Sequence, residues 1–168
     1  MGMILTSYNF EYGRTKIALN PEQEIDLEEY INSVEKEYLP KLFGKELFDL
    51  FVADWTGVPT SNRFMKVFYP FTFQNDYEMI QSEGMEKMLM DFVYYLYLRD
   101  DVTRSSTVGL ERVIGENTES VTAIGHDITS RYNEGTDTFK TIQYLMSTFD
   151  SVDYPEYKGV KVNFATIY

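Results

Sequence analysis

Apolar residues recur every three or four positions within the stretch NPEQEIDLEEYINSVEKEYL, which begins at Asn20. This spacing predicts an amphipathic helix. Two residues could cap the start of this helix. One is Asn20, followed by Pro21 at the first helical position, and the other is Asp26, with Glu29 three residues later. We expect Glu35 and the two charged residues after it to lie on the solvated side. The buried face would carry Leu27, Tyr30, Ile31, Val34 and Tyr38.

A corner is predicted after this helix, within the stretch YLPKLFGKELFDLF. Pro40 disfavours helical geometry at Leu39, and Gly44 suits the left-handed conformation that closes a helix. We therefore expect replacement of Gly44 by a β-branched residue to destabilise the chain. A second helix would run from Lys45 to about Trp55 and bury Leu47, Phe48, Phe51 and Trp55.

Two further helices follow from the same periodicity. One begins near Gly84, runs to about Arg99 and buries Met85, Met88, Leu89, Phe92, Val93 and Leu96. The longest would span about eight turns, with Val121, Ile124, Ile128, Tyr132, Gly135, Phe139, Ile142 and Met146 on one face. Gly125 and Gly135 inside it indicate close backbone approach or a bend, because glycine weakens a helix.

The remaining segments show other patterns. Tyr8, Phe10 and Tyr12 alternate with polar residues, which is typical of an extended segment or short strand. The aromatic segment between Arg63 and Gly84 has no clear period, and residues 102–119 indicate a long loop or loose hairpin. After a turn at Tyr154 and Pro155, alternation predicts a terminal strand containing Val160, Val162 and Phe164.

These elements predict a mostly α fold of one domain, residues 1–168. It would be a small helical bundle with a long final helix, a long loop or loose hairpin before that helix, and short extended or β arms at both termini. The N-terminal arm would cover 1–20, the helical body 21–149, and the C-terminal arm 150–168. A chain of 168 residues is long enough to bury a substantial core.

Charge and composition narrow the possible functions. The formal charge of -12 argues against a protein whose affinity comes from neutralising phosphates. The absence of cysteine excludes disulfides and thiolate chemistry. Without a basic start and an apolar run, or any run of about 18 apolar residues, we expect no signal peptide, no membrane span and no membrane partner.

Candidate catalytic residues are few. His126 is the only histidine and has no matching ligands nearby in the sequence, so a structural role is favoured. The acidic groups at 26–29 and at Asp100 and Asp101 are typical of helix ends and solvated surfaces. Met85 and Met88 fit a core better than an adaptable binding surface. Because no phosphate-binding, nucleophile or zinc motif occurs, we expect no catalytic, metal or cofactor site.

Four segments share a pattern with a known family. They are EKEYLPKLFG, from Glu35 to Gly44, followed directly by KELFDLF, then the helix SEGMEKMLMDFVYYLYLRDD, the loop SSTVGL and the RYN triplet that begins at Arg131. With these segments the chain resembles, from about Asp26 to Phe149, the helical-bundle head-tail connector, or adaptor, proteins of tailed bacteriophages.

The resemblance implies a non-enzymatic virion protein at the neck, assembled in the host bacterial cytoplasm. Such a subunit would form a ring homo-oligomer, expected to be a dodecamer, that joins the portal protein to tail, stopper or other neck proteins. DNA would pass through the lumen with only transient, non-specific proximity. A tail-completion or neck protein of another kind is the alternative, and a carboxylate- or metal-dependent enzyme is a more distant one.

Unpaired strands and apolar loops favour contact with neighbouring subunits. We therefore expect the corner at Pro40 and Gly44 to be structural, and the contacts to lie in the loop and the two arms. The expected intersubunit or partner contacts are Tyr8, Phe10, Tyr12, Val108, Leu110, Val113, Ile114, Tyr154, Tyr157, Val160, Val162 and Phe164.

Overall fold

The structure of the chain is a computed structural model. It describes residues 2–17, 20–74, 76–102, 105–106, 109–110, 119–158, 162 and 164, and side chains outside 101–125. Val108, Val113, Ile114 and Val160 lie outside the described residues, as does the side chain of Leu110.

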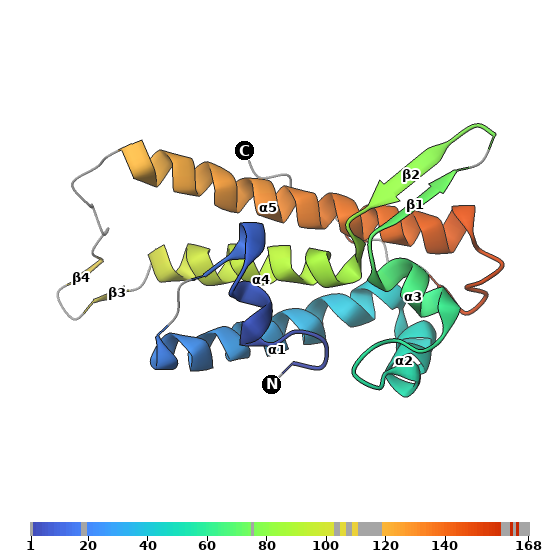
Figure 1. The fold of residues 1–168 in the computed structure, drawn as a ribbon, viewed down its shortest axis with the longest axis horizontal. Helices are drawn as coiled ribbons and strands as arrows, with labels where there is room; N and C mark the ends of the chain where they lie inside the picture. Colours follow the sequence, from blue (N-terminus) through green and yellow to red (C-terminus); the bar gives the residue numbers. More distant parts are fainter. Residues whose placement is uncertain are drawn as a thin grey trace.

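Three long helices form the body of the molecule. They are α1 (Pro21–Phe43), α4 (Gly84–Val102) and α5 (Glu119–Tyr144), and α5 is extended by a π-helical turn at Leu145–Phe149. They stack in layers with α4 in the middle, in contact with both α1 and α5 (Figure 1). Two short helices, α2 (Lys45–Asp54) and α3 (Asn62–Phe68), lie at one end of the stack (Figure 1). The mostly α bundle with a long final helix is therefore confirmed.

Helix α1 begins at the first of the two caps considered. The Asn20 side chain accepts hydrogen bonds from the Glu22 and Gln23 backbone N–H groups, and Pro21 occupies the first helical position. The expectation that Pro40 ends the helix is wrong, because Pro40 lies inside the last turn of α1. The helix continues because the Gly44 N–H donates to the Pro40 carbonyl at 2.9 Å and closes that turn.

The corner at Gly44 is confirmed. Gly44 ends α1 and α2 starts at the next residue, so Phe43 and Phe51 from the two helices stack with ring centroids 5.0 Å apart. The φ of 72° is positive as expected, but the ψ of 165° places Gly44 in an extended region rather than the left-handed helical one. That region is accessible almost only to glycine.

The core follows the predicted helical faces. Met85, Met88 and Phe92 of α4 are fully buried between α1 and α5. A Cβ at Gly135 of α5 would lie 3.1 Å from the Phe92 ring. Gly135 therefore allows the close approach of α5 to α4 that its place in the pattern predicted.

The aromatic segment before α4 forms a short helix and a β-hairpin. Strands β1 (Phe71–Gln74) and β2 (Met79–Ser82) pair antiparallel, with Phe71 opposite Ser82. The hairpin projects beyond α5 at one end of the bundle (Figure 1). Its inner face packs on the body, where Phe73 lies 6.2 Å from the Phe149 ring. At the opposite end, β3 (Ser105–Ser106) pairs with β4 (Gly109–Leu110), as expected of a loose hairpin (Figure 1).

The N-terminal segment is not the extended arm that alternation predicted. It forms 3-10 turns at Ser7–Phe10 and Gly13–Thr15. The Asn9 side chain starts the first turn by accepting from the Thr6 N–H at 2.9 Å. Phe10 is fully buried in the core, whereas Tyr8 and Tyr12 stay on the surface, so the aromatic spacing reflects a turn with one inward ring.

Glu35 holds the N-terminal segment in place, and the expectation that it lies on the solvated side of its helix is wrong. Its side chain is buried rather than solvated, and its carboxylate accepts from the backbone N–H groups of Met3, Ile4 and Leu5 at 2.5, 2.9 and 2.7 Å. Burial raises the pKa of Glu35, although the three hydrogen bonds favour the charged form. One carboxylate thus satisfies three main-chain donors that would otherwise lack partners.

The C-terminal segment also differs from a free strand. The turn after α5 is present, with the Tyr157 N–H bonded to the Tyr154 carbonyl at 3.0 Å. Val162 and Phe164 belong to no strand. The Phe164 ring packs on the chain's own core, 4.9 Å from Phe139 and 6.1 Å from Tyr38. Of the predicted strand only Val162 and Phe164 lie among the described residues, and there Phe164 is an inward aromatic residue.

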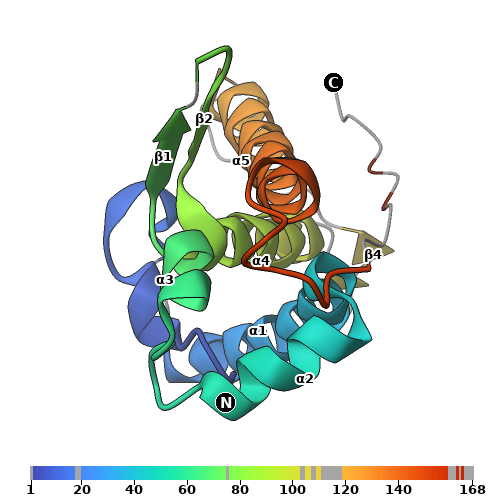
Figure 2. The same ribbon diagram turned by 90° about the vertical axis from the view of Figure 1, so that its right-hand side faces the viewer.

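Viewed along the bundle, the N-terminal segment and the β1–β2 hairpin lie on one side of the molecule, and the turn after α5 runs toward the other side (Figure 2). None of the helices in the described part of the chain has both the length and the apolar character needed to cross a membrane.

Candidate functional site

The expected contact residues divide into exposed and buried sets. Tyr8 and Tyr12 are 67% and 69% exposed, and their rings touch edge to face with centroids 6.3 Å apart. Phe10 and Tyr154 are buried in the chain's own core, so the expectation that they contact a neighbouring subunit is wrong for this fold.

The aromatic residues of the C-terminal segment mainly serve the fold. The Tyr154 hydroxyl donates to the Arg63 carbonyl at 2.5 Å and ties the segment to α3. Burial raises the pKa of Tyr157 to about 12. With Phe164 packed on Phe139, these three side chains are occupied within the chain. Tyr154, Tyr157 and Phe164 therefore pack within the chain itself.

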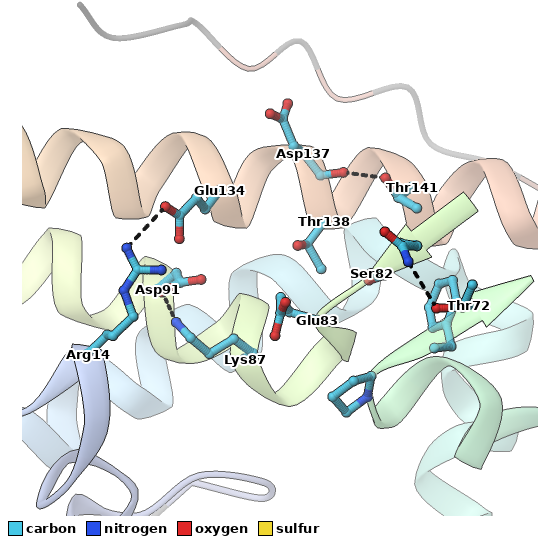
Figure 3. A pocket seen from close by; sticks show the side chains of 13 residues that line it. Arg14, Thr72, Ser82, Glu83, Lys87, Asp91, Glu134, Asp137, Thr138 and Thr141 are labelled. Carbon is cyan, nitrogen blue, oxygen red and sulfur yellow. Dashed lines mark hydrogen bonds and ion pairs between the residues drawn. The ribbon is translucent and has the colours of Figure 1, made fainter. Parts of the chain in front are cut away.

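A cleft that the sequence did not predict opens beside the β1–β2 hairpin. It has a volume of about 670 Å³, within the range of ligand pockets. Its walls come from the base of the hairpin, the start of α4, the middle of α5 and Arg14 of the N-terminal segment (Figure 3). Most of the side chains that line it are polar or charged.

A partly buried ion pair lines this cleft. Lys87 donates to Asp91 one turn later on α4, and Asp91 is only 2% exposed. Removal from water disfavours the charged carboxylate and raises the pKa of Asp91 to about 6, although Lys87 acts in the opposite direction. A buried carboxylate with a shifted pKa inside a cleft is a common feature of functional sites.

Helix α5 supplies a second charged group behind the cleft. The Arg131 guanidinium is 2% exposed and donates to Glu134 at 2.5 Å and to Asp127 at 3.3 Å. Asp127 also accepts from the Tyr94 hydroxyl of α4 at 3.2 Å. At the rim, Arg14 lies 3.8 Å from Glu134. The cleft is thus lined by charges from three separate parts of the chain.

The other candidates from the sequence stay apart from this cleft. His126 is exposed on α5, and Asp100 accepts from the Tyr30 hydroxyl and from Arg99. Within the described residues, no three His, Cys, Asp or Glu side chains converge as metal ligands. Met85 and Met88 are core residues, as expected.

The cleft escaped sequence reasoning because its residues come from distant segments. A signal was present in α4, where Lys87 and Asp91 stand four residues apart and only apolar residues lie between them. Such a pair is usually solvated on a helix surface. Only the position of α4 between two other helices buries Asp91, and that packing is not visible in the local sequence.

Comparison of the chain with protein-family models, curated proteins and solved structures finds no significant match.

The pKa of Asp91 predicts how stability depends on pH. Between about pH 4 and pH 6 the Asp91 carboxyl group keeps its proton in the folded chain and loses it in the unfolded chain. The contribution of Asp91 to stability therefore falls as pH rises through this window. Relative to Asp91→Asn, the parent should lose about 2 kcal/mol of unfolding free energy between pH 4 and pH 7. Urea unfolding at several pH values measures this difference.

Asp100 provides a control in which the change of stability with pH has the opposite sign. Its hydrogen bond from Arg99 lowers its pKa, so the parent should gain stability relative to Asp100→Asn as pH rises through the acidic range. A difference between the parent and Asp91→Asn that is constant from pH 4 to pH 7 would contradict the assignment of Asp91.

Proposed function

We propose that this chain is a subunit of an oligomeric head-tail connector ring, dodecameric in its assembled form, that joins a phage portal to the tail or stopper. DNA would pass through the lumen of the ring. The chain would act as a structural virion protein at the neck and would catalyse no reaction.

The α1–α2 corner carries this proposal. The residues of the resemblance, Glu35 to Gly44, form the end of a 23-residue helix and a turn into a second helix without an intervening loop. Such a corner places α2 against the end of a three-helix body. A small helical bundle is also what the resemblance implies for the body of a connector subunit.

Two hairpins at opposite ends of the body further support an assembly role (Figure 1). The β1–β2 hairpin has two strands of four residues, and an isolated hairpin of this size is marginally stable in water. Near its tip, Tyr77 is 98% exposed and Met79 is 58% exposed. Exposed aromatic residues and strand edges favour contacts with other chains. We place the ring contacts at this hairpin, at Tyr8 and Tyr12, and in the loop 102–119.

Mass measurement and negative-stain microscopy with the cognate portal protein test this proposal. We expect a ring on the portal, even if the chain alone remains monomeric, because such rings can close on their template. A chain that stays monomeric with the portal and does not bind it contradicts the proposal. Binding to tail-tube protein with indifference to the portal would instead identify a tail-completion protein.

A variant pair tests the hairpin. Tyr77→Ser should weaken assembly on the portal, whereas Val152→Ser should not, although Val152 is also 87% exposed. Val152 lies in the turn after α5 and belongs neither to the β1–β2 hairpin nor to the N-terminal segment. Equal assembly of both variants would remove the hairpin from the interface.

A further inference from the structure

The segment that follows α5 is joined to the short helices by ion pairs. The structure describes all of residues 150–158, which we call the strap, and they contain turns but no helix or strand. Lys66 of α3 donates to Asp150 at 2.9 Å and to Asp153 at 2.5 Å. These three side chains are between 24% and 41% exposed, so the pairs remain partly open to solvent. Ion pairs of this kind weaken when salt screens them.

Two further ion pairs extend along the strap. Arg63 of α3 donates to Glu156 at 3.1 Å, and Lys158 donates to Glu46 of α2 at 2.7 Å. The strap thereby joins both short helices at one end of the bundle (Figure 1). Because the strap itself is neither helix nor strand, its release would break these pairs without breaking an element of secondary structure.

Charge explains why the strap lies on α3. This helix carries Arg63 and Lys66 and no carboxylate, whereas each of the other α-helices of the described chain contains more carboxylates than cations. The strap contributes three carboxylates and one lysine. In a chain with a formal charge of -12, α3 is therefore the helix that attracts an acidic segment.

Apolar packing holds only a small part of the strap. Tyr154 is its one buried residue, whereas Tyr157 is half-buried and Val152 is 87% exposed. Segments with few buried contacts open locally, at a lower free energy than the whole fold. The ion pairs therefore supply a large share of what keeps the strap closed.

Lys66 also joins the strap to the β1–β2 hairpin. Its Nζ lies 6.0 Å from the centroid of the Phe73 ring of β1. The Phe73 ring lies 6.2 Å from the ring of Phe149, the residue directly before the strap. A cation over an aromatic ring is attracted to it, more strongly where water is partly excluded. One ammonium group thus contacts both the strap and the hairpin.

We propose that the strap opens while the rest of the bundle stays folded, and that Lys66 couples this opening to the position of the β1–β2 hairpin. In the closed state, Asp150 and Asp153 hold the Lys66 ammonium over the Phe73 ring. In the open state, Lys66 leaves the carboxylates and the hairpin loses this restraint. The consequence for assembly rests on the proposed function, in which the hairpin makes ring contacts. The strap itself belongs to the single chain, so its test needs no portal protein.

Amide hydrogen exchange of the full chain, followed by NMR, measures strap opening. The Tyr154 and Tyr157 N–H groups donate within the strap, so their exchange reports its release. Lys66→Met removes two ion pairs and should speed exchange at both amides at least about fivefold. Lys45→Met removes the exposed pair with Asp49 on α2 and should change these rates less than about twofold. Equal effects of the two variants would overturn the proposal.

Salt distinguishes an ion-paired strap from one held by packing alone. Raising NaCl from about 0.05 M to about 0.5 M should speed exchange at Tyr154 at least about threefold, because screening weakens the pairs. The response should be smaller in Lys66→Met, which has already lost two of them. Amides of Leu89 and Val93 in α4 should keep their rates, since the opening is confined to the strap. Acceleration of these α4 amides together with the strap would show global unfolding and would contradict the proposal.

A pair of variants tests the coupling to the hairpin. Asp153→Asn removes one carboxylate from Lys66 and should shift the NMR signals of the Phe73 ring. In the Lys66→Met background the same substitution should leave these signals in place, because the link is already broken. Equal shifts in both backgrounds would refute the coupling. Asp49→Asn, which removes the partner of Lys45, should not shift the Phe73 signals in the parent, and this comparison decides the matter even if Lys66→Met fails to fold.

Discussion

Glu35→Ala should lower the free energy of unfolding by about 4 kcal/mol, because it leaves three main-chain donors without their acceptor. The N–H groups of Met3, Ile4 and Leu5 all donate to this one carboxylate. Urea unfolding followed by circular dichroism measures the loss. Hydrogen exchange at these three amides should also become faster in the variant.

Two further substitutions make the Glu35 result specific. Glu35→Gln keeps one acceptor oxygen and the shape of the side chain, so we expect a smaller loss of about 2 kcal/mol. Glu29→Ala places the same alanine on the exposed face of α1, and stability should stay within about 0.5 kcal/mol. If Glu35→Ala were as stable as Glu29→Ala, the anchoring role of Glu35 would be wrong.

Gly84→Ala should be nearly as damaging, by about 4 kcal/mol, for a different reason. Gly84 has a φ of 86°, and an added Cβ would lie 2.5 Å from the Phe68 carbonyl oxygen and 2.6 Å from the Tyr69 carbonyl carbon. Both neighbours are backbone atoms, which cannot rotate away. The start of α4 would have to move from the end of α3, and thermal unfolding measures the cost.

Gly44→Ala separates the two causes of that loss. Gly44 also has a positive φ, of 72°, but an added Cβ would meet nothing within 4 Å. Its substitution should therefore cost only the backbone strain, about 2 kcal/mol. Equal losses at the two glycines would show that the contact with residues 68 and 69 contributes nothing.

The elements that the sequence predicted are those in which local pattern and packing agree. The apolar faces of α1, α4 and α5 follow helical spacing wherever their side chains are described, and the Gly44 corner follows from backbone chemistry. The errors arose where one residue changed the meaning of a pattern. Phe10 and Phe164 alternate as strand residues do, yet each turns a single ring into the core.

The buried charged side chains, both at the candidate site and under the N-terminal segment, were less predictable than the fold. Glu35 stands in a run of charged residues, and only the returning N-terminal segment gives its carboxylate a buried position. Asp91 and Thr138 belong to different helices separated by the loop 102–119. Their proximity depends on the close α4–α5 approach at Gly135, which a single sequence indicates but does not locate.

The place of α4 in the chain has a mechanical consequence. The β1–β2 hairpin ends at Ser82 and α4 begins at Gly84, while the β3–β4 pair follows the other end of the same helix. The two hairpins are therefore joined by a helix of 19 residues, about 28 Å long, that packs between α1 and α5. Force applied to one hairpin would be transmitted along this helix to the opposite end of the molecule.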